Sequence, residues 1–264
     1  MEVFDNLPLS SGCEILAVHP CGLLAINKKA GRAVHPNPNA GKGDKPPMLR
    51  AKYNFDGEYY SWLDEGGEKR RLYLINRLDS PTSGVVLAAV SREVADAAKA
   101  QFKLKNVEKI YKAIVLGRVF PNAGVWVDAL EVKAFGHFVR SAAGGAAGAA
   151  RRASAAYATE CFDENGLNLS LIRLEPKTGL THQLRVQCAR RRHPILGDAT
   201  YGDFARNKYV KNLSGLSRLF LHCQKTSIAF GLEGEKIAFS AEAPLPESFE
   251  KILRYNGQLR KKTF

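Results

Sequence analysis

The segment "INRLDSPTSG", residues 75–84, places an arginine and an aspartate two positions apart. The apolar runs on either side, "RLYLIN" and "GVVLAAV", predict two strands, and the Pro-Thr-Ser-Gly sequence between them favours a tight turn. Catalytic side chains are often carried on loops that adjoin a sheet, so Asp79 is a candidate catalytic carboxylate. Two structural roles stay open for it: an ion pair with Arg77, or a side-chain hydrogen bond that caps the turn.

A second group of polar and cationic side chains lies in "KTGLTHQLRVQCARRRHPILGDATYG", residues 177–202. Its candidate residues are His182, Gln183, Arg185, Arg190, Arg191 and Arg192. The first three stand at the start of a predicted helix and the last three at its end. Arginines there favour phosphate binding, but a solvated helix end would suit the helix dipole equally well. His182 could likewise be a histidine of the core.

Strand-like segments dominate the rest of the chain and come in pairs separated by turn sequences. Helical patterns are fewer and cover residues 91–103, 181–192 and 246–255; Ser91 is a good N-cap for the first. This order predicts an α+β fold, with a mixed, mostly antiparallel sheet flanked by a few helices. We expect a single catalytic domain over residues 1–264. The Ala/Gly-rich segment 141–153 predicts a mobile surface loop.

Charge and cysteine usage narrow the function classes. The chain has 39 Lys and Arg against 26 Asp and Glu, a net charge of +13. This points to a polyanionic partner, nucleic acid before an acidic membrane surface, although a basic surface can also serve solubility alone. The five cysteines form no C-x-x-C pair, which argues against a zinc ribbon and favours reduced thiols. We expect a cytoplasmic protein, because no signal-peptide pattern or membrane-length apolar run occurs.

Six segments together resemble the RluA-like pseudouridine synthases. These segments are "LAINKKAGRAVHP", "NRLDSPTSG", "KIYKAIVLG", "TGLTHQLRVQ", "HPILGDATYG" and "RLFLHC", and they follow the order of the family's motifs. The chain departs from those motifs at four places, where Lys29, Asn76, Leu180 and Gln187 replace proline, histidine, arginine and histidine. The first motif begins near residue 15, so we expect no separate N-terminal RNA-binding domain.

The resemblance implies an enzyme that isomerises uridine in ribosomal or transfer RNA to pseudouridine, without metal or cofactor and as a monomer. Asp79 would be the essential carboxylate, Arg185 its partner, and Tyr111 the residue against the target base. The sequence leaves open whether Asp79 attacks the ribose, attacks the base or removes a sugar proton. Arg77 would assist base flipping or bind phosphate, and the candidates from residues 182–192 would bind RNA. Tyr111 could instead simply pack within its strand.

Two other function classes compete with this interpretation. A catalytically silent RNA-binding protein with the same fold is the alternative, and the presence of Asp79, Tyr111 and Arg185 argues against it. A metabolic enzyme acting on phosphorylated small molecules would need a phosphate-binding loop. Neither G-x-G-x-x-G nor a Walker sequence occurs in the chain.

Overall fold

The computed structural model describes residues 6–37, 41, 45–135, 138–143, 150–163 and 166–255. The chain divides into two compact units. Unit 1 holds residues 1–108 and 223–244, and unit 2 holds residues 109–222 and 245–264. The sequence predicted a single catalytic domain over residues 1–264, and this remains a prediction.

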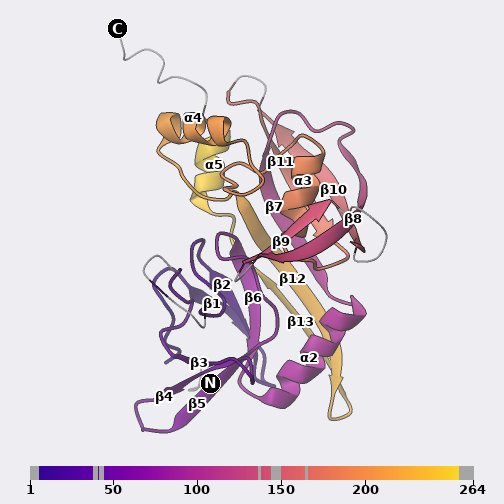
Figure 1. Cartoon of the computed structure of the whole chain (residues 1–264). Coiled ribbons are helices and arrows are strands. Elements are labelled where there is room, and N and C mark those ends of the chain that lie inside the picture. Colours follow the sequence, from indigo (N-terminus) through magenta and orange to yellow (C-terminus); the bar gives the residue numbers. More distant parts are fainter. Residues whose placement is uncertain are drawn as a thin grey trace. The chain divides into compact units, whose positions relative to one another are not determined.

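Unit 1 is built on an antiparallel sheet in the order β1-β2-β6-β5-β4-β3 (Figure 1). The strands are β1 (Glu14–Val18), β2 (Leu23–Lys28), β3 (Lys52–Asn54), β4 (Tyr59–Leu63), β5 (Lys69–Leu74) and β6 (Ser83–Ala89). All seven residues of β6 are buried, as its apolar sequence predicts. From Cys223 onward, β12 (Leu221–Leu232) belongs to this unit and forms a hairpin with β13 (Glu235–Glu242).

Helix α2 (Arg92–Leu104) packs on this sheet, against β5 and β6. The Ser91 side chain accepts a hydrogen bond from the Val94 N–H and so caps the first turn. Val94, Ala95 and Ala98 form the buried stripe of the helix. The helix predicted for residues 91–103 is therefore confirmed, with its cap.

Unit 2 contains a second run of antiparallel strands, in the order β7-β11-β10-β8-β9. These are β7 (Glu108–Leu116), β8 (Ala123–Phe135), β9 (Phe138–Ala143), β10 (Ala150–Phe162) and β11 (Leu169–Pro176). Three helices accompany them: α3 (Gln183–Arg190), α4 (Phe204–Ser214) and α5 (Glu247–Leu253). Their buried residues, among them Cys188, Val210 and Phe249, share one core with Ile114 and Leu174 of the strands.

The α+β fold class is confirmed, and α3 and α5 lie within their predicted ranges. Two features differ from the prediction. Helix α4 and the hairpin of β3 and β4 were not expected. Residues 141–143 and 150–153, expected in a loop, are strand residues because both segments pair with β8; residues 144–149 lie outside the described residues.

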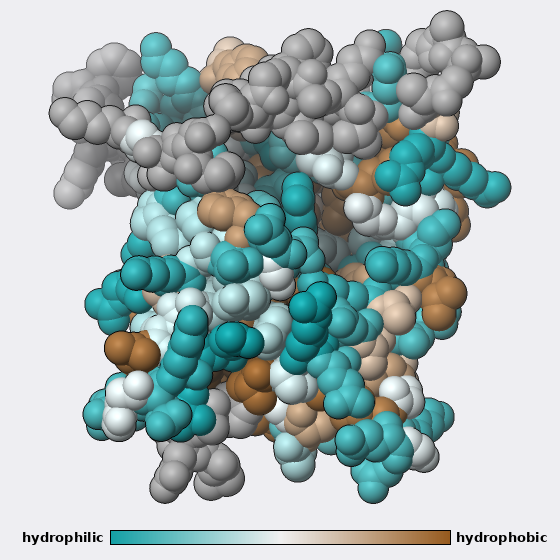
Figure 2. All heavy atoms as spheres, turned by 60° about the horizontal axis from the view of Figure 1, so that its bottom comes forward, coloured by the Kyte–Doolittle hydropathy of each residue, from teal (hydrophilic) through white to brown (hydrophobic). Residues whose placement is uncertain are grey.

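On the face drawn in Figure 2, hydrophilic side chains cover most of the described residues, and hydrophobic ones occur in small separate groups. Among the described helices, none combines the length and the apolar character that crossing a membrane requires.

Candidate active site

Asp79 begins a tight turn between β5 and β6. The Thr82 N–H donates to the Asp79 backbone carbonyl at 2.9 Å, with Ser80 and Pro81 at the corner of the turn. The turn is thus closed by the main chain of Asp79, and that hydrogen bond does not require its carboxylate. Asp79 itself is half-buried.

Asn76 ends the pairing of this segment with β6. The Ile75 N–H donates to the Leu87 carbonyl at 3.1 Å, and the Leu87 N–H donates to Asn76 Oδ1 at 2.7 Å. The side chain thus supplies the acceptor that the main chain would supply in a continued strand. Residue 76, where the motif has histidine, therefore has a structural role in this chain.

Lys28 holds the turn from the other side. Its side chain is fully buried at the end of β2, and its Nζ donates to three carbonyl oxygens: Lys29 at 3.2 Å, Arg32 at 2.8 Å and Ser80 at 3.0 Å. The Gly31 N–H donates to the same Ser80 carbonyl at 2.8 Å. Because Ser80 follows Asp79 directly, Lys28 restrains the backbone that carries the candidate carboxylate.

Arg77 is exposed and lies among groups of the same unit. Burial lowers the pKa of His35, its own backbone hydrogen bond acts in the opposite direction, and the positive charge of Arg77 lowers the pKa further. Burial raises the pKa of Tyr53 to about 12 against the charge of Arg77, and the pKa of Glu58 is lowered first by Lys99 and also by Arg77. Arg77 is thus an exposed cation two residues from Asp79, which is compatible with its predicted contact to RNA.

In unit 2, Arg185 is buried on α3 and holds the carboxylate of Asp198. Its Nε donates to Asp198 Oδ2 at 2.7 Å, and its Nη2 donates to Oδ1 at 2.8 Å. The guanidinium also lies over the Tyr201 ring, 5.2 Å from the ring centre. Two parallel hydrogen bonds and an aromatic face fix the guanidinium plane.

The carboxylate of Asp198 stays ionised in spite of its burial. Burial by itself would raise its pKa, but the hydrogen bonds and charge of Arg185 act against burial. The N–H groups of Thr200 and Tyr201, which donate to Oδ1 at 2.8 and 3.0 Å, add to this effect. The pKa of Asp198 therefore lies below its usual value.

His182 and Gln183 begin α3 in different ways. His182 is the residue before the helix, with a left-handed backbone (φ 56°), and its Nδ1 lies 3.0 Å from the Tyr201 hydroxyl. Gln183 is buried, and its amide oxygen accepts from the Thr178 hydroxyl at 2.7 Å and the Leu180 N–H at 3.2 Å. Its amide nitrogen donates within the fold as well. This geometry gives Gln183 a structural role, and its predicted contact with RNA stays a prediction.

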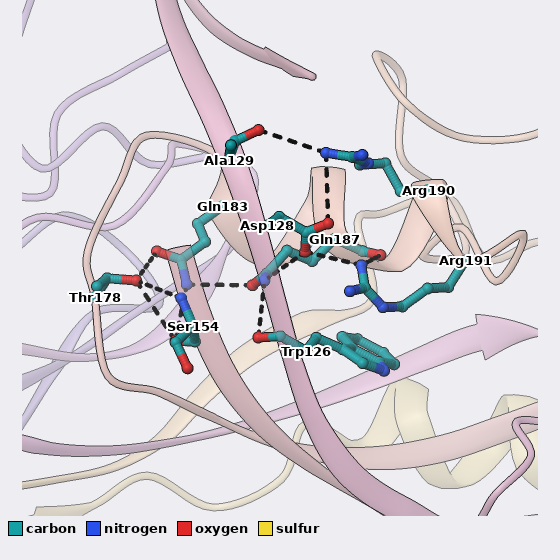
Figure 3. Close-up of polar contacts among 9 residues, drawn as sticks. All are labelled: Trp126, Asp128, Ala129, Ser154, Thr178, Gln183, Gln187, Arg190 and Arg191. Carbon is teal, nitrogen blue, oxygen red and sulfur yellow. Dashed lines mark hydrogen bonds and ion pairs between the residues drawn. The ribbon is translucent and has the colours of Figure 1, made fainter. Parts of the chain in front are cut away.

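Gln187 continues this network across to β8 (Figure 3). Its side-chain oxygen accepts from Gln183 Nε2 at 3.2 Å, and its Nε2 donates to Asp128 Oδ2 at 2.9 Å. Gln187 is fully buried; its hydrogen bond with Gln183 is buried and the one to Asp128 is partly buried. Residue 187, where the motif has histidine, joins α3 to the sheet.

Arg190 and Arg191 both contact Asp128 (Figure 3). The Arg191 Nη1 lies 2.9 Å from Asp128 Oδ2, and the Arg190 Nη1 lies 3.4 Å from Oδ1. The guanidinium of Arg191 also lies 4.9 Å from the centre of the Trp126 ring. The third predicted residue, Arg192, is exposed and follows the helix with a left-handed backbone. Arg190 and Arg191 therefore have a partner within the fold, and both Arg190 and Arg192 are exposed.

Tyr111 lies in β7 opposite Leu174 of β11 and packs, partly buried, against the core of unit 2. Leu180, where the motif has arginine, packs on a small cluster formed by Leu130, Ala153 and Val186. Packing explains why a leucine at position 180 suits this fold. For Tyr111, packing is the structural role that the sequence left open beside the catalytic one.

Sequence reasoning did not find the roles of Lys28, Asp128 and Asp198. Lys28 and Asp198 lie inside motifs, and this position in a motif could have indicated that they matter for the site. Asp128 lies in a strand with no motif, and its partners are about sixty positions away.

The chain was compared with known proteins. A family model described as RNA pseudouridylate synthase matches residues 22–190. The tRNA pseudouridine synthase C of Yersinia pestis is 34% identical over 240 residues, covering 83% of this chain and 82% of that protein. The ribosomal large subunit pseudouridine synthase C of Vibrio vulnificus (strain CMCP6) is 32% identical over 232 residues, covering 88% and 66%.

A solved structure, human RNA Pseudouridylate Synthase Domain Containing 1, has a similar fold. The TM-score is 0.63 at 22% identity, and the match covers 90% of this chain and 86% of that one. The structural match supports the fold, and the family model and the two relatives cover most of the sequence. The chain therefore belongs to the RNA pseudouridylate synthase family.

Proposed function

We propose that this protein isomerises uridines in ribosomal or transfer RNA to pseudouridine, with Asp79 as the essential carboxylate. The reaction breaks the bond between uracil N1 and ribose C1′, rotates the base and joins C1′ to C5. C5 loses a proton and N1 gains one, so atoms and charge balance. The observation that carries the proposal is the Asp79 turn, where a family motif is held in place by the buried ammonium of Lys28.

The roles proposed for other residues follow from the motifs. Arg185 and Tyr111 take part in the reaction, Arg77 assists base flipping, and His182 and residues 190–192 contact RNA. A flat, fixed guanidinium such as that of Arg185 suits a role that depends on orientation. If the Tyr111 hydroxyl moves a proton, Tyr111→Phe slows turnover roughly a hundredfold or more. Stacking or packing alone would leave the rate nearly unchanged.

Ribosomal RNA and transfer RNA are the two candidate substrates, because one of the two relatives is named a transfer RNA enzyme and the other a ribosomal RNA enzyme. The net charge of +13 supports a polyanionic substrate, and RNA affinity should fall steeply with added salt. Action in the cytoplasm and as a monomer is part of this proposal. Mapping pseudouridine across total RNA, with and without the protein, identifies the substrate.

The test of catalysis is Asp79→Asn, which removes the charge and keeps the shape of the side chain. We expect no tritium release from RNA labelled at uridine C5, with RNA affinity and thermal unfolding close to those of the unmodified protein. Substantial turnover by the variant would refute the assignment of Asp79. Absence of turnover by the unmodified protein on all RNA, with RNA binding retained, would favour the catalytically silent alternative.

A further inference from the structure

The hairpins of β3, β4 and β5 carry a groove far from the candidate carboxylate. Its volume is about 720 Å³, within the range of about 300–1,000 Å³ typical of ligand sites. The lining residues are Arg50, Ala51, Lys52, Ser61, Trp62, Leu63 and Lys69. Lys69 opens β5, whose extended rise of about 3.4 Å per residue places its far end about 17 Å away. Asp79 follows that far end, so the groove is a separate feature of unit 1.

The groove exists because β3 is shorter than β4. The β3–β4 pairing ends where Lys52 faces Ser61. The chain before it turns to another partner: the Arg50 N–H donates to the Pro8 carbonyl at 2.7 Å. The last residues of β4, Trp62 and Leu63, therefore have no β3 residue opposite them. The groove lies where the chain before β3 turns away from β4.

The side chains around the groove combine positive charge with apolar surface. Arg50, Lys52 and Lys69 are exposed, and the Leu63 side chain is 68% exposed. Trp62 is half-buried and alternates with Ser61 and Leu63 along β4, so its ring lies on the face of the hairpin opposite to Lys52 and Lys69. Among the described residues that line the groove, none carries a carboxylate. Cations and an aromatic side chain along one groove are a pattern that binds single-stranded nucleic acid, with phosphates on the cations and a base on the ring.

The carboxylate that directly follows Leu63 is engaged within the β4–β5 turn. Asp64 follows Leu63, and its Oδ2 lies 2.6 Å from Arg70 Nε. Its Oδ1 accepts from the N–H groups of Gly66 and Glu68 at 3.0 and 2.9 Å. Asp64 therefore organises the β4–β5 turn, and its charge is balanced by Arg70 instead of by the lysines of the groove.

We propose that this groove binds a single-stranded stretch of the substrate RNA, outside the uridine that is modified. The proposal rests on the RNA-modifying function stated above, and it adds a second point of contact to it. The phosphates would lie against Lys52 and Lys69 on one face, and the strand would pass over the edge of β4 that β3 leaves unpaired, so that one base meets Trp62 on the other face. Such a contact would select RNAs with an unpaired segment at a fixed distance from the target.

Trp62 provides a direct readout. The chain has two tryptophans, and the other, Trp126, is buried and stacked on Tyr157 at 4.3 Å between ring centres. A twelve-nucleotide oligouridylate RNA should quench the tryptophan emission of the unmodified protein and leave that of Trp62→Phe unchanged. Equal quenching of both proteins would overturn a contact to Trp62. Equal quenching of the unmodified protein by polyglutamate would overturn RNA as the occupant.

The cations are tested by the double variant Lys52→Gln, Lys69→Gln. We expect about a tenfold rise in the Kd for the same RNA, and a salt slope shallower by about 1.4, since each lost phosphate contact contributes about 0.7 on single strands. The matched control is Lys103→Gln, Lys236→Gln, two exposed lysines of unit 1 outside the groove lining. Equal effects of the two double variants would overturn the groove as the binding place.

These measurements separate this inference from the proposed function. Quenching and Kd need no turnover, so they stand even where no pseudouridine forms. In tritium-release assays, the Lys52→Gln, Lys69→Gln variant should raise KM and keep kcat, since the groove is remote from Asp79. Normal turnover by the unmodified protein without Trp62 quenching would refute the groove and leave the function intact.

Discussion

Arg185 and Asp198 form a buried, bidentate ion pair, in which 5% of the arginine and 1% of the aspartate side chain is exposed. The two residues are thirteen positions apart, on α3 and on the loop that follows it. The ion pair therefore joins two of the family motifs to each other. Its geometry depends on the whole loop, because the same carboxylate accepts from two N–H groups of that loop.

Replacing Asp198 should destabilise the protein strongly. Asp198→Ala leaves the Arg185 guanidinium buried without its carboxylate, and we expect the free energy of unfolding to fall by about 3–5 kcal/mol. Urea unfolding measures this change. The matched control is Asp96→Ala, which removes an exposed partner of Arg92 and should cost well under about 1 kcal/mol. A similar small loss for both variants would contradict a structural role of the buried pair.

The same carboxylate should make stability depend on acid pH. Its pKa is lower in the folded protein than the usual 3.8, so the ionised form is stabilised by folding. This contribution is complete above the unfolded pKa and is lost as the pH falls through the folded pKa. We expect the free energy of unfolding of the unmodified protein to decrease below about pH 4 more steeply than that of Asp198→Asn. Parallel curves would show that Asp198 does not contribute.

Lys28→Met should lower turnover, because the Ser80 carbonyl in the turn of Asp79 loses its side-chain donor, as do two carbonyls of the segment after β2. A displacement of about 1 Å at a catalytic group can cost about a hundredfold in rate, and we expect kcat to fall on that scale. Ser80→Ala is the control in the same turn, since the Ser80 Oγ is buried and makes no hydrogen bond in the structure. Tritium release measures both, and urea unfolding identifies loss of fold. A folded Lys28→Met variant with normal kcat would show that Lys28 does not position Asp79.

Gly84→Ala tests the last residue of the motif. Gly84 has a φ of +112°, and a Cβ there would lie 2.1 Å from the Cys223 carbonyl oxygen in unit 1. Backbone strain alone costs about 1–2 kcal/mol for such a conformation, so the collision should bring the loss above that value. Gly67→Ala is the control, with φ +79° and no atom within 4 Å of its Cβ. Equal losses on urea unfolding would mean that Cys223 moves aside without cost.

Local sequence signals predicted the elements that carry them. Ser91 and the alanine-rich run after it predicted α2, and the turn between β1 and β2 predicted their hairpin. Helix α4 was missed because Val210 is its one fully buried residue, so its apolar pattern is weak. Its caps, Asp203 and Gly215, were nonetheless present in the sequence.

For the candidate site, the motifs predicted which residues have a function but not which residues they contact. Nothing local indicates that Gln187 and Arg191 meet Asp128, which comes from a strand far away in the sequence. A cluster of arginines predicts positive charge, but their partners depend on tertiary packing. Arg190 and Arg191 have Asp128 as a partner in the fold, and their predicted contact with RNA stays a prediction.

Asn76 shows that a sheet can be extended without extending a strand. Its side-chain oxygen accepts the hydrogen bond of the Leu87 N–H. The main chain at Asn76 therefore does not have to pair with β6, and the Leu87 donor on β6 still has an acceptor. The backbone is then free to leave the sheet and carry Asp79 into its turn. A neutral histidine could offer a ring nitrogen as acceptor to the same N–H. The difference between this chain and the motif is thus an exchange between two acceptors, and other chains with a short polar acceptor here can be expected to keep the turn.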